Sequence, residues 1–475
     1  MSIPPERLRD LAGDPAPAPA ASEHVLVLGA GMAGLAAAYE LRRRGFAVTI
    51  LEAQPRVGGR IQTFREPFSD GLYGEAGAMR IPRAHDLVLR YVERFGLETV
   101  PFVMENPRTY VAFGGERIRR GEFDSARHAG DFELQPGETD LPIGQRWERE
   151  IAPLLATIER HGALGWEEVA SEYDQYSLAE FLESRGWSQG AIELWGLLTH
   201  MEPFMNSAFL EVLREEAGRW FTDVVTIPGG MDRLPRAFLA PLGDAVRYGM
   251  RVIAIHQSQE GVQVRCRTVA GEHTFTADRA VITIPFSLLR HIEITPALSR
   301  GKQRAIRTLS YDAATKIFFQ CRRRFWEEDD GIAGGGSVTD LPVRTIYYPA
   351  GGAPGGRGIL LASYTWAEDA RRWGTLAPDE RLAQAIENVE VIHPAVRQEF
   401  ELGASKVWHQ DEFAGGAYAL FEPGQQTHLY RHIIAPEGRL HFAGEHASLA
   451  HGWIQGAVES GLRCVAEILE RAPAR

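Results

Sequence analysis

The sequence predicts an α/β fold in which one sheet-based domain is discontinuous along the chain and a helical region is inserted. Three observations predict this class. A short apolar strand near residue 24 runs into closely spaced glycines and a helix, the stretch 122–221 is mostly helical in composition, and alternating strand patterns return after residue 250. The 475 residues are enough for two or three packed regions with sizeable cores.

Composition narrows the possible function classes. The formal net charge of -12 argues against general binding of nucleic acid or anionic membranes, because both select basic surfaces, so a small ligand is favoured. The cysteines Cys266, Cys321 and Cys464 are odd in number and widely spaced, which gives neither a disulfide framework nor a metal-ligand pattern. The sequence lacks a secretory signal and a long apolar run, and we expect a soluble cytoplasmic protein without a metal site.

The first elements follow from local patterns. The alternating Pro and Ala of "DPAPAPAAS" are typical of an extended segment, so residues 1–22 are expected to form a flexible leader. "HVLVLGAG" predicts a short buried strand. Apolar residues at three-to-four spacing then predict a helix from Ala33 to Arg44, with Gly45 just beyond it, and "FAVTILEA" predicts a second strand.

Later segments show the same two periodicities. Within the helical stretch, "SLAEFLESRG" and "NSAFLEVLREEAG" are the clearest helices. "MRVIAIHQS", "GVQVRCRTV" and "RAVITIP" indicate strands of a returning sheet. From Lys316 to Trp408 strands and glycine-rich turns dominate, and "PAGGAPGGRG" is expected to be a mobile loop.

Gly29, Gly31 and Gly34 have the spacing G-x-G-x-x-G, directly after the first strand and at the opening of the helix. Glu52 ends the second strand about twenty residues on, where a carboxylate can accept hydrogen bonds from a ribose diol. The glycines permit a tight turn and close approach to a pyrophosphate, which faces the helix N-terminus. The pattern predicts a Rossmann-like dinucleotide site. The alternative is a glycine-rich turn in a plain α/β fold, and NAD and FAD both remain open at this point.

The next segment, "LEAQPRVGGRIQT", resembles the flavin amine oxidase superfamily, in which a second glycine pair (Gly58 and Gly59) lets the chain pass close to FAD and an arginine (Arg60) contacts it. The resemblance continues through "GGMDRLP", "TKIFFQCRRRFWE" and "FAGEHASLAHGWIQGAVESGLR". It implies noncovalent FAD, since no cysteine lies in an attachment motif. The implied organisation is an FAD-binding domain (23–62, 229–312 and 435–475), a substrate-binding domain (63–120 and 313–434) and a helical domain (121–228).

The resemblance also implies FAD contacts for the carboxyl-terminal segment. Glu445 is expected to meet the ribityl or phosphate region of FAD. A helix beginning near Trp453 would direct its free N–H groups at flavin N1 and O2, where negative charge gathers on reduction. The full set of expected FAD contacts is Gly29, Gly31, Met32, Ala33, Gly34, Glu52, Ala53, Arg60, Gly77, Met79, Arg80, Val252, Glu445, Trp453, Ile454 and Ala457.

Arg80 places a full positive charge inside "GEAGAMRIP", a run of small and apolar residues. An arginine cannot shed its proton there, so it needs an anionic partner. Within the superfamily this segment looks most like L-amino-acid oxidases. In those enzymes a methionine, here Met79, lies beside FAD, the arginine holds the substrate's α-carboxylate, and a tyrosine matched by Tyr364 shares that carboxylate. The alternative is a structural ion pair between Arg80 and Glu75 or Glu93.

Other family positions complete the expected site. Lys316, on the predicted strand "KIFFQ", matches a lysine that holds a water at flavin N5; the alternative is an edge or snorkelling lysine. Trp408 and Trp453 match aromatic residues that wall the site over the flavin ring, with ordinary core tryptophans as the alternative. Ala417 would leave room for bulky or aromatic substrates, and Gly452 is the remaining expected substrate contact.

The resemblance has one departure. Some animal relatives carry a histidine proposed as a base, whereas "SAFLEVLREEAG" offers Glu215, expected to be a solvated helix residue or at most a group at the pocket entrance. Hydride transfer from the α-carbon of the neutral amine to flavin N5 needs no strong base.

The resemblance therefore implies an L-amino-acid oxidase that acts through Arg80, Tyr364, Lys316 and Trp453. With oxygen it would produce a 2-oxo acid, ammonia and hydrogen peroxide from an L-amino acid. The alternatives are an amine or polyamine oxidase, an amino-acid 2-monooxygenase and a non-catalytic flavoprotein. A homo-oligomer, most simply a dimer, is expected.

Overall fold

A computed structural model describes residues 4–13, 23–349 and 356–471. Its organising element is a parallel sheet of five strands in the order β10-β2-β1-β14-β23. These strands are β1 (His24–Leu28), β2 (Ala47–Leu51), β10 (Val246–Arg247), β14 (Arg279–Ile282) and β23 (Leu440–Phe442). Apart from β1 and β2, which are joined through one helix, neighbouring strands come from segments far apart in the sequence. The predicted α/β fold with a discontinuous Rossmann-like sheet is confirmed.

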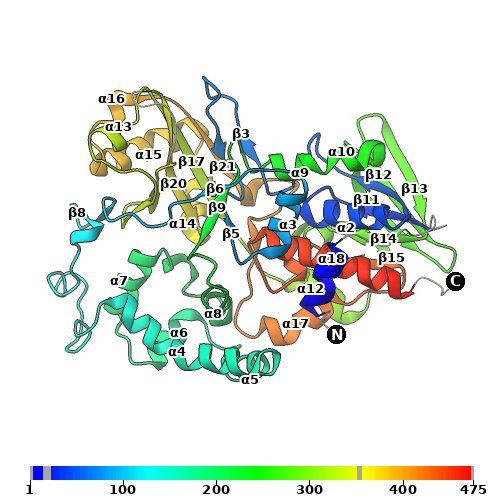
Figure 1. Ribbon diagram of the computed structural model, residues 1–475, viewed down its shortest axis with the longest axis horizontal. Helices are drawn as coiled ribbons and strands as arrows, with labels where there is room; N and C mark the ends of the chain where they lie inside the picture. The colour runs from blue at the N-terminus through cyan, green and yellow to red at the C-terminus, as the bar shows by residue number, and fades with distance from the viewer. Residues whose placement is uncertain (1–3, 14–22, 350–355, 472–475) are drawn as a thin grey trace.

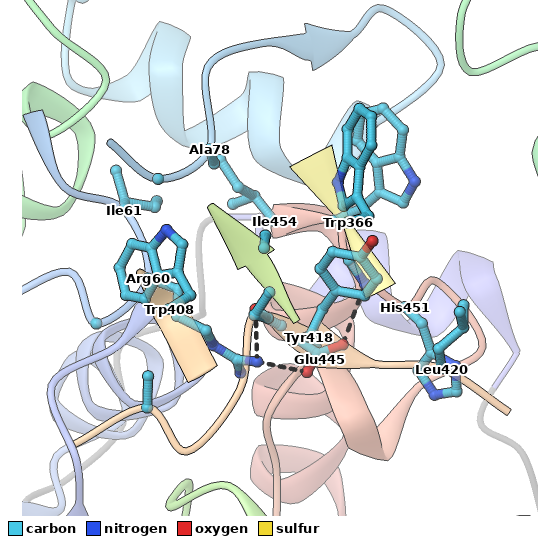
Figure 2. A pocket seen from close by; sticks show the side chains of 18 of the residues that line it. Arg60, Ile61, Ala78, Trp366, Trp408, Tyr418, Leu420, Glu445, His451 and Ile454 are labelled. Carbon is cyan, nitrogen blue, oxygen red and sulfur yellow. Dashed lines mark hydrogen bonds and ion pairs between the residues drawn. The ribbon is translucent and has the colours of Figure 1, made fainter. Parts of the chain in front are cut away.

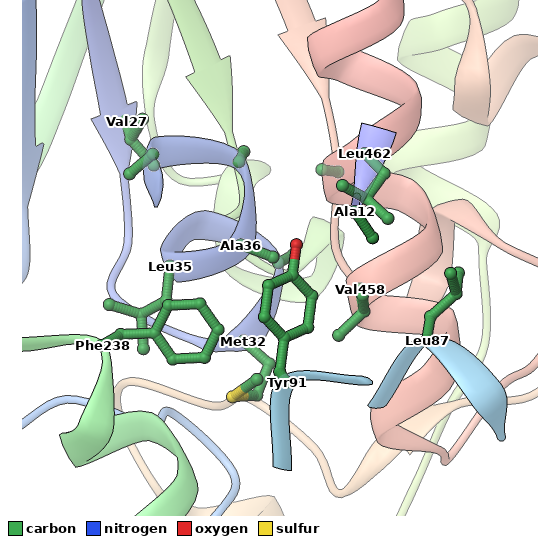
Figure 3. Packing of buried hydrophobic residues seen from close by; sticks show 14 of the residues in the cluster. Ala12, Val27, Met32, Leu35, Ala36, Leu87, Tyr91, Phe238, Val458 and Leu462 are labelled. Carbon is green, nitrogen blue, oxygen red and sulfur yellow. The ribbon is translucent and has the colours of Figure 1, made fainter. Parts of the chain in front are cut away.

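Helices α2 (Met32–Arg43) and α18 (Ile454–Arg471) lie side by side against this sheet, in blue and red in Figure 1. Their apolar faces share one core cluster, in which Leu35 and Ala36 of α2 join Val458 and Leu462 of α18, all fully buried (Figure 3). Full burial of a Val or Leu side chain stabilises the fold by about 1.5–3 kcal/mol. This contact therefore holds the first and last segments of the core together.

The other face of the parallel sheet packs against a second core cluster. Because side chains alternate along a strand, Val27 of β1 points toward α2 and α18, whereas Leu26 and Leu28 point the opposite way. There they pack with Val264 of a four-stranded sheet in the order β13-β12-β11-β15. Its strands are β11 (Arg251–Gln257), β12 (Val262–Thr268), β13 (Gly271–Ala277) and β15 (Glu293–Thr295).

A second large sheet has seven strands in the order β21-β17-β20-β19-β18-β7-β8. These are β7 (Tyr110–Phe113), β8 (Glu116–Arg119), β17 (Ala314–Cys321), β18 (Gly336–Thr339), β19 (Thr345–Tyr347), β20 (Gly358–Trp366) and β21 (Phe400–Val407). Every residue of β17 is buried. The antiparallel register of β17 and β20 places Lys316 directly opposite Tyr364.

Five helices occupy the stretch predicted to be helical: α4 (Ile143–His161), α5 (Ala163–Tyr173), α6 (Leu178–Ser184), α7 (Gln189–Thr199) and α8 (Phe209–Gly218). They form the teal and green group apart from the parallel sheet in Figure 1. Ser177 begins α6 with a capping box to Glu180, as a Ser-x-x-Glu pattern favours. The rings of Phe181 and Phe209 stack 3.7 Å apart and lock α6 against α8.

Shorter elements connect these layers. The helices are α3 (Asp86–Arg94), α9 (Arg233–Ala237), α10 (Leu239–Leu242), α11 (Phe286–Leu289), α12 (Arg300–Thr308), α13 (Phe325–Glu328), α14 (Ala367–Gly374), α15 (Pro378–Ile392), α16 (Val396–Glu399) and α17 (Gln425–Ile434). The strands are β3 (Thr63–Phe64), β4 (Gly74–Glu75), β5 (Ile81–Pro82), β6 (Val100–Pro101), β9 (Val224–Thr226), β16 (Tyr311–Asp312) and β22 (Tyr418–Ala419).

The amino terminus corrects one expectation. Residues 1–22 were expected to form a flexible leader, but Pro5–Leu11 form helix α1, with proline at its first position, where the missing N–H costs nothing. Leu11 and Ala12 are buried in the cluster that contains α2 and α18 (Figure 3). Residues 14–22, which carry the Pro-Ala repeat, lie outside the described residues. So do residues 350–355 of the expected mobile loop.

No helix within 4–13, 23–349 or 356–471 combines the length and apolar character needed to cross a bilayer. Over the same ranges, no group of three or more His, Cys, Asp or Glu side chains is arranged to hold a metal ion. The three cysteines are buried and free of disulfides.

Lysine is rare in this chain and is used mainly inside it. Only Lys302, Lys316 and Lys406 occur among 51 basic residues. Lys302 and Lys316 are almost fully buried. The amine of Lys302 donates to the carbonyl of Ile433 at 2.7 Å and lies 3.6 Å from the ring centre of Phe442. Burial lowers the pKa of Lys302 to about 7 from its ordinary 10.5.

This burial predicts a pH dependence of stability. Between about pH 7 and 10.5 the unfolded chain keeps a proton that folded Lys302 has released, so raising the pH over this window favours folding. Lys302→Met should therefore flatten the rise of the unfolding free energy between pH 7 and 10, measured as urea midpoints of the apoprotein. Lys406→Met, which removes the amine that pairs with Asp411, is the control. Equal slopes in the wild type and Lys302→Met would contradict the prediction.

Candidate active site

A cavity of about 1920 Å³ is lined by residues from the parallel sheet, the seven-stranded sheet and helices α4 and α8. Part of its lining is shown in Figure 2. The expected cofactor and substrate contacts that line it are Gly29, Gly31, Met32, Ala33, Glu52, Ala53, Arg60, Gly77, Met79, Arg80, Val252, Lys316, Tyr364, Trp408, Ala417, Glu445, Gly452, Trp453, Ile454 and Ala457. Gly34 is the exception, because it faces the strand beneath.

The three motif glycines have different local environments. Gly29 has a φ of 114°, a conformation that favours glycine. A Cβ at Gly34 would lie 2.1 Å from the carbonyl oxygen of Gly29, so only glycine lets α2 approach the strand. A Cβ at Gly31 would meet no protein atom within 4 Å, and Gly31 lines the cavity. The turn thus leaves open space at the N-terminus of α2, which fits a pyrophosphate.

Glu52 is fixed at the end of β2 by backbone donors. Its carboxylate accepts hydrogen bonds from the N–H of Ala30 at 2.6 Å and of Gln54 at 2.8 Å. Burial raises the pKa of Glu52, and these two hydrogen bonds act in the opposite direction. The carboxylate therefore sits beside the glycine turn and lines the cavity, as a ribose acceptor requires.

Glu445 joins three distant segments around the cavity. Its Oε1 accepts a hydrogen bond from Arg60 at 2.8 Å and from the N–H of Ala419 at 3.0 Å, and its Oε2 accepts from the N–H of Gly452 at 3.1 Å. The ion pair with Arg60 is drawn in Figure 2. Arg60 also reaches the carbonyl of Ala417. Both carboxylate oxygens are thus used by the protein itself.

Arg80 contrasts with Arg60. Its Nη1 atom is buried and has no hydrogen-bond partner among the residues described. Three aromatic rings surround the guanidinium, with the centres of Phe221, Phe102 and Tyr347 at 5.2, 5.9 and 5.9 Å from its Cζ. Cation–π contacts of this kind attract a cation without neutralising its charge.

The structural ion pair considered for Arg80 is not formed. The carboxylate of Glu75 accepts hydrogen bonds from the N–H of Met231 at 2.8 Å and the hydroxyl of Thr63 at 2.9 Å. Neither Glu75 nor Glu93 pairs with Arg80 in the part of the chain that the structure describes. The guanidinium thus remains available to a ligand anion.

Lys316 and Tyr364 are cross-strand neighbours on the cavity wall. The amine of Lys316 donates to the carbonyls of Glu75 at 2.9 Å and Gly77 at 2.7 Å, and lies 4.3 Å from the ring centre of Tyr364. Burial lowers the pKa of Lys316 to about 7; Glu75 opposes this shift and Arg80 adds to it. Burial raises the pKa of Tyr364 to about 12, so its hydroxyl keeps a proton to donate.

The two tryptophans are anchored through their indole N–H groups. Trp408 donates to the carbonyl of Ala76 at 2.7 Å, and Trp453 donates to Oε1 of Glu215 at 2.8 Å. Glu215 lines the cavity, so the expectation of a solvated helix residue is wrong. Helix α8 turns this side of its surface toward Trp453 rather than toward bulk water. Burial raises the pKa of Glu215 to about 7, and the indole hydrogen bond opposes the shift.

Sequence analysis missed the aromatic residues around Arg80. Phe102, Phe221 and Tyr347 come from three separate segments, and none belongs to a motif. Their only common feature in the sequence is an aromatic side chain, which is more often a core residue. Tyr418, which also lines the cavity, gave no signal either.

Comparison with known proteins agrees with this geometry. Residues 32–469 match the model of the flavin containing amine oxidoreductases. The chain belongs to this family. Membership implies a flavin cofactor, and the glycine turn, Glu52 and the open space at Gly31 fit one.

Named relatives extend over almost the whole chain. YobN of Bacillus subtilis (strain 168), provisionally named an L-amino-acid oxidase, is 41% identical over 455 residues, which is 94% of this chain and 94% of that protein. An L-amino-acid oxidase of Bothrops pauloensis is 34% identical over 456 residues, covering 94% of this chain and 89% of the relative.

Solved structures show the same fold at lower identity. A redesigned putrescine oxidase has a TM-score of 0.76 at 23% identity and covers 96% of this chain and 100% of its own. A cyclohexylamine oxidase from Brevibacterium oxydans has a TM-score of 0.74 at 20% identity, covering 94% and 100%. The likeness concerns the fold.

The glycine turn gives a matched pair of variants. Gly34→Ala should lower the unfolding free energy by about 1–3 kcal/mol, because its Cβ would overlap the carbonyl of Gly29. Gly31→Ala should leave the thermal midpoint of the apoprotein unchanged, since the backbone φ of -73° suits alanine and the space is open, but should lower the flavin-to-protein absorbance ratio. Full flavin content in Gly31→Ala would contradict the placement of the cofactor at this turn.

Proposed function

We propose that this protein is an FAD-dependent L-amino-acid oxidase. It would convert an L-amino acid to a 2-oxo acid, with release of ammonia and hydrogen peroxide. The observation that carries the proposal is the guanidinium of Arg80 in the cavity, which aromatic rings surround and whose buried Nη1 atom has no hydrogen-bond partner among the described residues. An amine substrate offers no anion to this group, whereas the α-carboxylate of an amino acid does. The names of the relatives from Bacillus subtilis and Bothrops pauloensis support the same substrate class.

In this proposal Arg80 and Tyr364 bind the substrate carboxylate together. The guanidinium supplies charge and N–H donors, and the tyrosine supplies an O–H that stays protonated over the physiological range. Fixing the carboxylate at two points orients the α-carbon and its C–H bond, which lowers the entropic cost of reaching the reactive geometry.

Burial also affects the charge of the groups around the oxidised carbon. The chemistry that bound FAD would supply is uptake of a hydride from the α-carbon at N5 and transfer of the electrons to oxygen. Lys316 lies on the same wall as Tyr364 and shares the cavity with Arg80, and the residue's low pKa lets it lose or take a proton near neutral pH. We propose that it positions the water that hydrolyses the released imine.

A screen of paired substrates tests the function. The purified holoenzyme is assayed for peroxide with each L-amino acid, its D-form and the amine that lacks the carboxylate. Peroxide and a 2-oxo acid from L-amino acids alone would support the proposal. Turnover of the amines instead would indicate an amine oxidase, and an amide product would indicate a 2-monooxygenase. A flavin colour that no substrate bleaches under nitrogen would indicate a flavoprotein without turnover.

Arg80→Ala should lower kcat/KM for L-amino acids by about two to four orders of magnitude, because leaving a buried charge without its partner costs roughly 3–5 kcal/mol. Turnover of any amine and the flavin content should change far less. Arg83→Ala is the matched control, since Arg83 lies three residues on and makes only an exposed pair with Asp223. Unchanged amino-acid kinetics in Arg80→Ala would remove the assignment.

Lys316→Met should keep flavin bound but slow turnover or flavin reoxidation by about tenfold or more, the effect of losing about 1.4 kcal/mol of stabilisation. Stopped-flow absorbance separates the reductive half-reaction from reoxidation by oxygen. Lys302→Met controls for the loss of a buried amine elsewhere in the core. Wild-type rates in both half-reactions of Lys316→Met would exclude a role for this lysine.

A further inference from the structure

The cavity holds a second ionisable group that the proposed chemistry does not use. Glu215 is the residue of α8 whose carboxyl lies against Trp453. Oε1 accepts the indole N–H at 2.8 Å, and no basic side chain of the described chain pairs with either oxygen. One oxygen of the carboxyl is thus held by Trp453, and the residue lines the cavity.

The neighbouring acids on α8 are already engaged. Glu211 accepts a hydrogen bond from Nδ1 of His451 at 3.0 Å, and Glu216 accepts one from the indole N–H of Trp147 at 3.1 Å. Glu211 and Glu216 both act against ionisation of Glu215, whereas Arg80 favours it. A cationic or hydrogen-bond-donating ligand group is therefore what would stabilise the Glu215 carboxylate.

Phe221 and Trp453 form an aromatic surface that links Arg80 to Glu215. The ring centre of Phe221 lies 5.2 Å from Cζ of Arg80 and 5.4 Å from the ring of Trp453, and Trp453 holds Glu215. Trp220 adds a further ring, 5.8 Å from Trp453. Arg80 and Glu215 line the same cavity and form no ion pair within the described residues, although Arg80 acts to lower the pKa of Glu215. This arrangement fits a ligand with an anionic end and, several bonds away, a cationic end.

The α-amino nitrogen of an amino acid is only two bonds from its carboxylate carbon. A carboxylate held at Arg80 therefore keeps that nitrogen near Arg80, at the near end of the aromatic surface. The end of a long side chain can extend past the rings, and a guanidinium or ammonium group is attracted by the faces of tryptophan and phenylalanine along the way.

We propose that Glu215 is a specificity-determining residue that binds the cationic end of the substrate side chain, so that the enzyme selects L-amino acids with basic side chains. This inference rests on the proposed function, because it needs the substrate carboxylate at Arg80. Ala417, on the cavity wall, leaves space for a long substrate.

The test compares L-arginine with L-citrulline, which has the same length and shape but an uncharged ureido end. For the wild-type holoenzyme, kcat/KM for arginine should exceed that for citrulline by at least about tenfold. Glu215→Gln keeps an acceptor for Trp453 and removes the charge. It should lower the arginine-to-citrulline ratio by about ten- to hundred-fold, the range expected for a hydrogen bond to a charged group.

Two controls separate local contact from general effects. Glu216→Gln removes a carboxyl one residue along the helix and keeps an acceptor for Trp147, and it should shift the ratio by less than about threefold, because Glu216 is held at Trp147 and not at Trp453. L-Leucine, which has no polar end, should be turned over by Glu215→Gln within about threefold of the wild type. A loss of leucine turnover that parallels the loss of arginine turnover would show that Glu215 only supports the site, and would overturn the inference.

The failure of this inference is distinguishable from failure of the proposed function. Equal kcat/KM values for arginine and citrulline, with active turnover of both, would overturn the role of Glu215 and leave the oxidase intact. Similar falls in the ratio in Glu215→Gln and Glu216→Gln would replace direct contact with a long-range charge effect. An enzyme that oxidises none of the three amino acids but oxidises amines would overturn the proposed function itself.

Discussion

The carboxylate of Glu445 is the constraint on which the cavity depends. It binds the guanidinium of Arg60, the N–H of Ala419 and the N–H of Gly452, so that one buried group ties the segment after β2 to two segments more than 350 residues away. A carboxylate with this degree of burial is stable as an anion only when such donors surround it. The segments that line the cavity are therefore held to one another by this group, while α2 and α18 share one core cluster.

Other buried carboxylates also have such partners, so a buried charged group without one is informative. Glu40 is fully buried and is satisfied by Tyr91, Arg44 and neighbouring arginines, and Glu211 is matched by His451. Arg80, by contrast, is surrounded by aromatic rings, and its buried Nη1 atom has no hydrogen-bond partner among the described residues. The physical reading is that the missing counter-charge belongs to a ligand. Glu215 shows the same incompleteness at the other end of the aromatic surface, and together the two groups describe a zwitterionic guest.

Local patterns in the sequence were sufficient for the elements that depend on local interactions. Periodicity predicted the strand β1 and the helix α2, and the glycine spacing predicted the turn between them. The distance of Glu52 from this turn along the chain predicted its place at the end of the second strand. Lys316 lies opposite Tyr364 because of the register between β17 and β20, and no local sequence pattern specifies that register. Helix α1 was missed because its burial comes from packing against α2 and α18, and α18 lies at the other end of the chain. Glu215 was misplaced because its environment depends on how α8 packs against Trp453.

Arg80 and Lys316 differ in whether their side chains can lose a proton inside the protein. Arginine remains charged at any physiological pH, so Arg80 is a permanent cation suited to holding an anion. Lysine can lose its proton when buried, and Lys316 does so near neutrality because burial and Arg80 both disfavour its charge. In a sequence where lysine is otherwise almost absent, an arginine at position 316 would fix a second permanent charge beside Tyr364. Two fixed cations on one wall would hold the carboxylate more tightly and would leave no group there able to exchange a proton. With Arg80 and Lys316, the arginine provides the permanent charge for binding and the lysine provides the group that can exchange a proton.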